Sequence, residues 1–184
     1  MPLKPASKRT HLHSRKVACE GYQRDDGLWD IEARLVDTKP FRFENRLGGR
    51  TVGADEPIHG MQLRVTLDLG LTIRDIDAAS DFHPFGACSA APERMQALIG
   101  LKIGGGFMRQ VRERVGVSLG CTHLIEMMSH IATTAFQTMN PTWEEIATKK
   151  PNKEKPHYLD SCVALRGDGD VIRRAWPDFY RQKS

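Results

Sequence analysis

The residues best suited to chemistry lie on a predicted helix that starts near residue 120. His123, Glu126 and His130 follow one another at steps of three and four residues, which places them on one helical face. An imidazole and a carboxylate one turn apart can share a proton or bind a metal ion together. In the first helical turn the dipole disfavours the imidazolium form of His123, so a neutral imidazole can act as a base with Glu126 orienting it. The alternative is a solvated helix face.

Cys121 stands at the start of the same helix. The helix dipole favours a thiolate there, so Cys121 is a candidate nucleophile or metal ligand, and a buried core thiol is the alternative. The four cysteines are widely spaced and include no CxxC pair, so we expect thiols or ligands rather than disulfides.

Other candidate groups precede a predicted hairpin. Asp30 and Glu32 share one face of a strand over residues 29–35, where apolar and charged residues alternate. Two such carboxylates can divide acid and base roles or bind a cation, and a solvent-facing sheet surface is the alternative. His59 enters the next hairpin from a loop, a place where functional residues are common.

The pattern around these residues predicts antiparallel strands followed by helices. We expect residues 37–43 to pair back on the first strand, and residues 63–69 and 71–76 to form a hairpin. Helices are predicted for residues 92–103, up to Val115 after the Gly104–Gly106 break, and from residue 120 to just before Pro141. Residues 149–157 read as a linker, and residues 161–165 and 171–176 as a second hairpin. The expected fold is α+β, an antiparallel sheet with helices packed on one face.

Length and charge favour one domain, residues 17–184, behind a basic flexible tail of residues 1–16. The tail holds five Lys and Arg residues and no acid, while the rest of the chain is nearly neutral. A tail is not a basic patch, so we expect no nucleic-acid partner. The chain has neither a signal-peptide pattern nor an apolar run that spans a bilayer, so we expect no membrane partner and a cytoplasmic location.

Three spaced motifs resemble a bacterial family known as domain of unknown function 2889. They are Arg24–Glu32 (RDDGLWDIE), Asp37–Lys39 (DTK) and Gly120–Glu126 (GCTHLIE), and the likeness runs from about Arg15 to Phe179. The resemblance implies that the chain comes from bacteria that degrade lignin-derived aromatic compounds. It also implies the activity of a phenylcoumaran-type lyase that releases formaldehyde.

A second, fainter resemblance covers residues 53–136, which are similar in order to NifU/IscU-type iron–sulfur scaffolds. Pro57-Ile58-His59-Gly60 enters a hairpin, Cys88 precedes a helix and Cys121 opens another. This likeness implies a NifU/IscU-like core in which Cys88, Cys121 and His59 converge. His59-Gly60-Met61 replaces the Cys-Gly-Asp of those scaffolds, so zinc fits the three residues better than cluster assembly does.

Our leading hypothesis is a cofactor-independent enzyme that acts on a small aromatic molecule by general acid–base chemistry, as a formaldehyde-releasing C–C lyase. His123 or His59 would be the base, and Glu126, Asp30 or Tyr22 the proton donor. Candidate substrate-binding residues are Trp29, Phe85, Phe107 and Arg24. The alternative hypothesis is a zinc or iron–sulfur binding module that uses Cys88, Cys121 and His59. The sequence is compatible with a homo-oligomer as well as with a monomer.

Overall fold

The computed structural model describes residues 3–149, 155–156 and 158–182, with side chains left out for residues 147–149. The chain divides into two compact units, Met1–Asn140 and Pro141–Ser184. Among the described residues, no helix combines the length and the apolar character that a membrane crossing requires.

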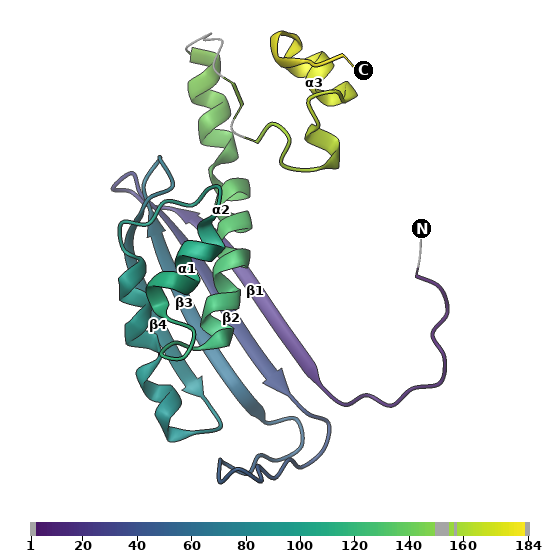
Figure 1. The fold of residues 1–184 in the computed structure, drawn as a ribbon, viewed down its shortest axis with the longest axis vertical. Coiled ribbons are helices and arrows are strands. Elements are labelled where there is room, and N and C mark those ends of the chain that lie inside the picture. Colours follow the sequence, from purple (N-terminus) through teal and green to yellow (C-terminus); the bar gives the residue numbers. More distant parts are fainter. Residues whose placement is uncertain (1–2, 150–154, 157, 183–184) are drawn as a thin grey trace. The chain divides into compact units, whose positions relative to one another are not determined.

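Four antiparallel strands form the sheet of the first unit, in the order β1-β2-β3-β4 (Figure 1). Their bounds are β1 Ser14–Gln23, β2 Trp29–Thr38, β3 Pro57–Leu67 and β4 Ile73–Phe82. Every neighbouring pair follows directly along the chain, so the sheet is a simple meander. The predicted α+β class and the predicted hairpin of β3 and β4 are confirmed.

One face of this sheet is covered by helices (Figure 1). Helix α1, Phe107–Val115, and the first half of helix α2, Thr122–Lys149, lie over it. The apolar side chains of β2 and β3 alternate and point to this covered face. The largest fully buried side chains of the core are Ile31, Leu35, Met61, Leu67, Ile73, Ile76, Met95, Leu98, Leu124, Met127, Met128 and Ile131.

Helix α2 runs along β1. A Cβ built on Gly21 of β1 would collide with the side chain of Thr138, so this glycine allows the helix to approach the strand closely. Cys19, two residues earlier on β1, contacts Thr134, one turn earlier on α2. Strand and helix therefore advance in the same direction, and the start of α2 lies beside the start of β1.

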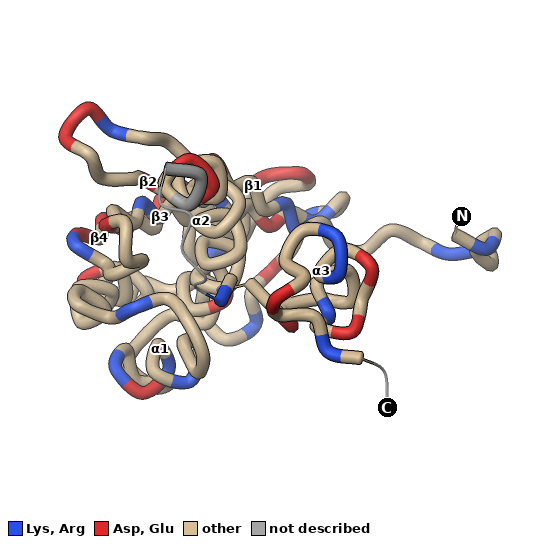
Figure 2. Tube along the Cα trace, turned by 90° about the horizontal axis from the view of Figure 1, so that it is seen from above, with Lys and Arg blue, Asp and Glu red and all other residues tan. Residues whose placement is uncertain are grey.

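Helix α1 carries both basic and acidic residues on its exposed side. Its charged residues, all exposed, are Arg109, Arg112, Glu113 and Arg114, and both signs are visible along the helix in Figure 2. Burial of Phe107, Val111 and Val115 fixes the opposite side of this helix against the core.

Several predicted boundaries of the first unit are wrong. Strand β1 begins at Ser14, so the last three residues assigned to the tail belong to the sheet. Residues 37–43 form no second strand, because β2 continues to Thr38 and Phe43 makes only an isolated bridge with Val52. The helix predicted for residues 92–103 is a 3-10 helix, Pro92–Leu98, after a shorter one, Gly86–Ala90.

In the second half of the chain two further predictions are wrong. Helix α2 continues through Pro141, which removes one backbone hydrogen bond from the helix without ending it. The predicted C-terminal hairpin is a 3-10 turn, Val163–Leu165, and a short helix α3, Asp170–Ala175, followed by a 3-10 turn, Pro177–Phe179. Asp160 accepts a hydrogen bond from the Gly167 backbone, which holds the glycine-rich segment as a turn before α3. The predicted linker of residues 149–157 lies mostly outside the described residues.

Candidate functional site: a buried aspartate between two histidines

A carboxylate ends the apolar stripe on the covered face of β2. Trp29, Ile31, Ala33 and Leu35 alternate along the strand and are buried. Asp37 takes the next position of the same face and is only 1% exposed. Because a buried charge is costly unless it is paired and hydrogen-bonded, the surroundings of Asp37 must supply partners.

The sheet register supplies two of these partners. Arg15 on β1 and His59 on β3 stand directly opposite Asp37, so the three residues form one row across three strands. Arg15 donates to both carboxylate oxygens, from Nε to Oδ1 and from Nη2 to Oδ2, each at 2.8 Å. Nδ1 of His59 lies 3.0 Å from Oδ2.

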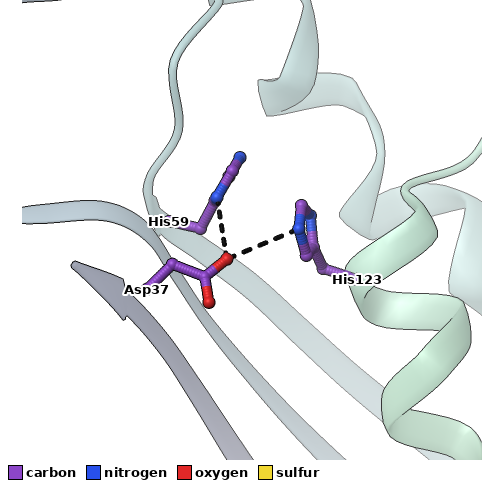
Figure 3. Close-up of side chains that lie close together, drawn as sticks. All are labelled: Asp37, His59 and His123. Atoms are coloured by element: carbon purple, nitrogen blue, oxygen red, sulfur yellow. Dashed lines mark hydrogen bonds and ion pairs between the residues drawn. The ribbon is translucent and has the colours of Figure 1, made fainter. Parts of the chain in front are cut away.

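The first turn of α2 adds the second histidine. Nε2 of His123 lies 3.6 Å from Oδ2 of Asp37, so both histidines face the same oxygen (Figure 3). The two imidazole rings are 4.1 Å apart between centroids and tilted by 39°. We refer to Asp37, His59 and His123 as the histidine–aspartate cluster.

The electrostatics of the cluster favour an ionised carboxylate and neutral imidazoles. Burial acts to raise the pKa of Asp37, but the hydrogen bonds and charge of Arg15 outweigh it and hold this pKa below its ordinary value. Burial lowers the pKa of His59, against the charge of Asp37. Burial also lowers the pKa of His123, and the neighbouring His59 and Arg15 add to that decrease.

A second ring of polar groups surrounds the cluster. Nη1 of Arg15 donates to Glu126 at 2.8 Å, so this guanidinium bridges the buried and the exposed carboxylate. Nε2 of His13 lies 3.3 Å from Oδ1 of Asp37. On the other side of His123, Nδ1 lies 3.7 Å from the sulfur of Cys121. Three residues predicted for the site, His123, His59 and Cys121, are therefore neighbours, and Glu126 is linked to them through Arg15.

Other predicted site residues lie at the opposite end of β2. Asp30 is seven positions before Asp37, about 23 Å along an extended strand. It accepts hydrogen bonds from Thr66 at 2.6 Å and from Arg24 at 3.4 Å, while Tyr22 donates to Glu20 at 2.7 Å. Trp29 is a buried core residue. The structure does not bring these residues to the cluster.

The remaining candidates, Phe107, Phe85 and Cys88, lie outside the histidine–aspartate cluster. Phe107 is buried in the core at the start of α1, and Phe85 is partly exposed before the first 3-10 helix. Cys88 lies within that 3-10 helix. Of the groups of three or more His, Cys, Asp and Glu side chains in the described chain, only the histidine–aspartate cluster has ligand atoms close enough to share a metal ion. The predicted set of Cys88, Cys121 and His59 does not converge.

Two residues of the site, Arg15 and Asp37, are not predicted from the sequence. Asp37 appears there only within the motif Asp37–Lys39, and Arg15 falls in the predicted tail. The alternation along β2 does indicate Asp37. The apolar positions Trp29, Ile31, Ala33 and Leu35 are followed, at the next position of the same face, by this carboxylate. A charged residue at the next core-facing position of a strand requires a partner or a function.

The arrangement offers two kinds of chemistry. A neutral imidazole oriented by a carboxylate can take up a proton, and two imidazoles with one carboxylate can hold a metal ion.

Comparison with known proteins places this site inside a recognised family. No curated protein and no solved structure matches the chain, and none supports the likeness to NifU/IscU-type scaffolds. One family model matches residues 13–137, more than half of the chain, and this range includes every member of the histidine–aspartate cluster together with Arg15 and Glu126. The chain belongs to the family described as "Protein of unknown function (DUF2889)".

Proposed function

We propose that this chain is a small-molecule enzyme whose chemical step is proton transfer at the histidine–aspartate cluster. The observation that carries the proposal is the single oxygen of buried Asp37 that faces Nδ1 of His59 at 3.0 Å and Nε2 of His123 at 3.6 Å. A carboxylate that accepts a hydrogen bond from one ring nitrogen leaves the other nitrogen able to take a proton.

His59 is the proposed proton acceptor. With its Nδ1 proton directed at Asp37, Nε2 carries the lone pair. Burial lowers the pKa of His59, which keeps the ring neutral and ready to accept a proton near neutral pH. Once the ring is protonated, the Asp37 carboxylate stabilises the imidazolium.

The proposed reaction is a C–C cleavage that releases formaldehyde from a lignin-derived aromatic compound. The base takes the proton of a hydroxymethyl group, the C–O bond becomes the carbonyl of formaldehyde, and the C–C bond breaks. Its electron pair forms a C=C bond and expels an aryl ether oxygen, which a donor then protonates. This reaction changes no net oxidation level and requires only a proton acceptor and a proton donor. His123 and Glu126 are the proposed donors and would pass on the proton that His59 takes up. The ring of His123 lies 4.1 Å from that of His59, and Glu126 is joined to Asp37 through Arg15.

The test is formaldehyde release from phenylcoumaran dimers, in which the hydroxymethyl group and the aryl ether oxygen stand on adjacent carbons. We expect His59→Gln and His123→Gln to lower the rate by about 100-fold or more, the usual contribution of a positioned acid or base. His130→Gln is the matched control, since His130 is exposed on the same helix and outside the cluster. Absence of formaldehyde with every dimer, or full activity of both cluster variants, would contradict the proposal.

A further inference from the structure

Three side chains of the cluster present ligand atoms to one common point. A carboxylate oxygen of Asp37 and one ring nitrogen from each histidine all lie within 4.8 Å of one another. The three residues come from β2, β3 and α2, so the fold assembles them rather than a local sequence motif. Figure 3 shows both rings directed at the same side of the carboxylate.

The spacing of these atoms fits a metal centre. Two ligands bound to one zinc ion at about 2.0–2.1 Å stand about 3.3 Å apart in tetrahedral geometry. The two distances from Oδ2 of Asp37, 3.0 Å to His59 and 3.6 Å to His123, lie on either side of that value. We propose that Asp37, His59 and His123 bind one divalent transition metal ion, with zinc as the first candidate.

Hydrogen bonding alone does not account for the position of His123. Oδ2 of Asp37 already accepts hydrogen bonds from Arg15 at 2.8 Å and from His59 at 3.0 Å. A carboxylate oxygen has about two lone-pair sites, and the 3.6 Å from Nε2 of His123 is beyond the range of an N–H···O bond. A metal ion between the three groups would give this nitrogen a bond that the carboxylate cannot.

The groups around the cluster resemble the hydrogen-bond partners that surround the ligands of a metal centre. A ligating carboxylate is commonly held by further hydrogen bonds, as Arg15 holds Asp37. A ligating histidine usually has a partner on its other nitrogen, and Cys121 occupies that position beside His123. The positive charge of Arg15 opposes a dication, but Glu126 shares this guanidinium and offsets part of its charge.

The ligand types favour zinc or a similar first-row ion over an iron–sulfur cluster. Two imidazoles and one carboxylate form the ligand set of several catalytic zinc sites, which keep a fourth position open. No thiolate belongs to the set, although thiolates are the usual ligands of iron–sulfur clusters. For its role, this inference rests on the proposed C–C cleavage: the open position would receive the substrate hydroxyl and lower its pKa. With His59 bound to the ion, Glu126, which lies outside the ligand set, would accept the hydroxyl proton in its place.

The binding test uses the full chain without an affinity tag, stripped with a chelator and titrated with zinc sulfate in a calorimeter. We expect one zinc ion per chain. His59→Gln and His123→Gln should each weaken binding by about 100-fold or more, because loss of a ligand costs at least as much as loss of a second-shell partner. His130→Gln should bind as the wild type does. No saturable binding, or unchanged binding in both cluster variants, would overturn the inference.

A second measurement does not depend on whether the variants fold. NMR signals of the histidine rings are recorded on the wild-type chain as zinc is added. The signals of His59 and His123 should shift together at one equivalent, while that of His130 stays in place. If only the rings of His11 and His13 shift, zinc binds the N-terminal arm and the inference is wrong.

Formaldehyde release before and after zinc loading separates this inference from the proposed function. Stripped protein that binds no zinc and still releases formaldehyde contradicts the metal site and leaves the enzyme proposal intact. Zinc binding that depends on His59 and His123, without formaldehyde from any dimer, contradicts the enzyme proposal and supports the metal site.

Discussion

Removal of the Arg15 guanidinium is the sharpest structural test of the cluster. Asp37 is 1% exposed, and Arg15 gives it two hydrogen bonds of 2.8 Å. Loss of one partner from a buried ion pair costs about 3–5 kcal/mol because the other charge stays buried. The Arg15 side chain is 36% exposed, so water screens part of the interaction. We therefore expect Arg15→Met to lower the free energy of unfolding by about 2–3 kcal/mol near pH 7.

The chain contains a matched control for this substitution. Arg24 also contacts a carboxylate with Nε and Nη2, at 3.1 and 2.6 Å from the oxygens of Asp26, but both side chains are exposed. Water screens an exposed ion pair, so Arg24→Met should change the free energy of unfolding much less than Arg15→Met does. The two arginines share the two-bond geometry, and each also contacts a second carboxylate, Glu126 for Arg15 and Asp30 for Arg24, so the main difference between them is the burial of Asp37.

The decrease in the free energy of unfolding that Arg15→Met causes should also depend on pH. Arg15 holds the pKa of Asp37 below its ordinary value, so its contribution is complete above about pH 4 and disappears as the pH falls through the folded-state pKa. The difference between wild type and variant is therefore expected to shrink in acid. Urea unfolding read by hydrogen exchange of the β2 and β3 amides reports on this sheet alone. Equal losses in the Arg15 and Arg24 variants, or a difference that does not change with pH, would refute the reasoning.

Three further predictions concern the same sheet and helix. Asp37→Asn should lower the pKa of His59 further, because it removes the charge that raises it; an NMR titration that shows an increase would contradict the electrostatic assignment. Gly21→Ala should destabilise the chain by about 1–3 kcal/mol, since its Cβ meets Thr138, and Thr138→Ala in that background should recover part of the loss in urea unfolding. Folding lowers the pKa of His59 and of His123, so the free energy of unfolding should fall as the pH drops below about 6.5. Between about pH 6.5 and 5 this fall should be smaller in the His59→Gln/His123→Gln double variant, as measured by urea unfolding.

The strands and helices of the first unit could be predicted largely from hydrophobic periodicity. β2 alternates from Trp29 to Leu35, and the apolar positions of β3 alternate in the same way, because each strand has one covered and one open face. On α2, apolar residues three or four positions apart (Leu124, Met128, Ile131 and Ala135) predict a helix, and they form its buried face. The predicted end before Pro141 is wrong because the helix continues to Lys149. Periodicity reports which face is buried, and a long helix can accept one proline without changing that face.

The C-terminal segment shows where short-range patterns mislead. Residues Arg166–Asp170 contain two glycines and two aspartates, which suit a hairpin turn as well as the turn that precedes a helix. The choice depends on contacts further along the chain. Arg181 donates its backbone N–H to Gly167, and its side chain pairs with Asp160, so the segment folds as a turn before α3.

The candidate site could be predicted only in part, because its geometry depends on strand register. His123 and His59 were identified by residue type, and the structure brings them together. Their common partner Asp37 meets His59 only through the alignment of β2 with β3, which are joined by a long loop over residues 39–56. A loop of that length does not fix register, and a slip by one residue would turn Asp37 to the open face.

The position of Asp37 also allows a test of whether the cluster is maintained at a cost in stability. Burial of an ion pair is often less favourable than apolar packing of similar volume, by about 1–4 kcal/mol. Arg15→Met combined with Asp37→Leu would continue the apolar stripe of β2 and leave no buried charge without a partner, since Glu126, which also loses Arg15, is 51% exposed. We expect this double variant to be at least as stable as the wild type in urea, and more stable than Arg15→Met alone, while it loses zinc binding and activity. A double variant less stable than Arg15→Met would mean that Asp37 is present mainly to hold β1, β2 and β3 together.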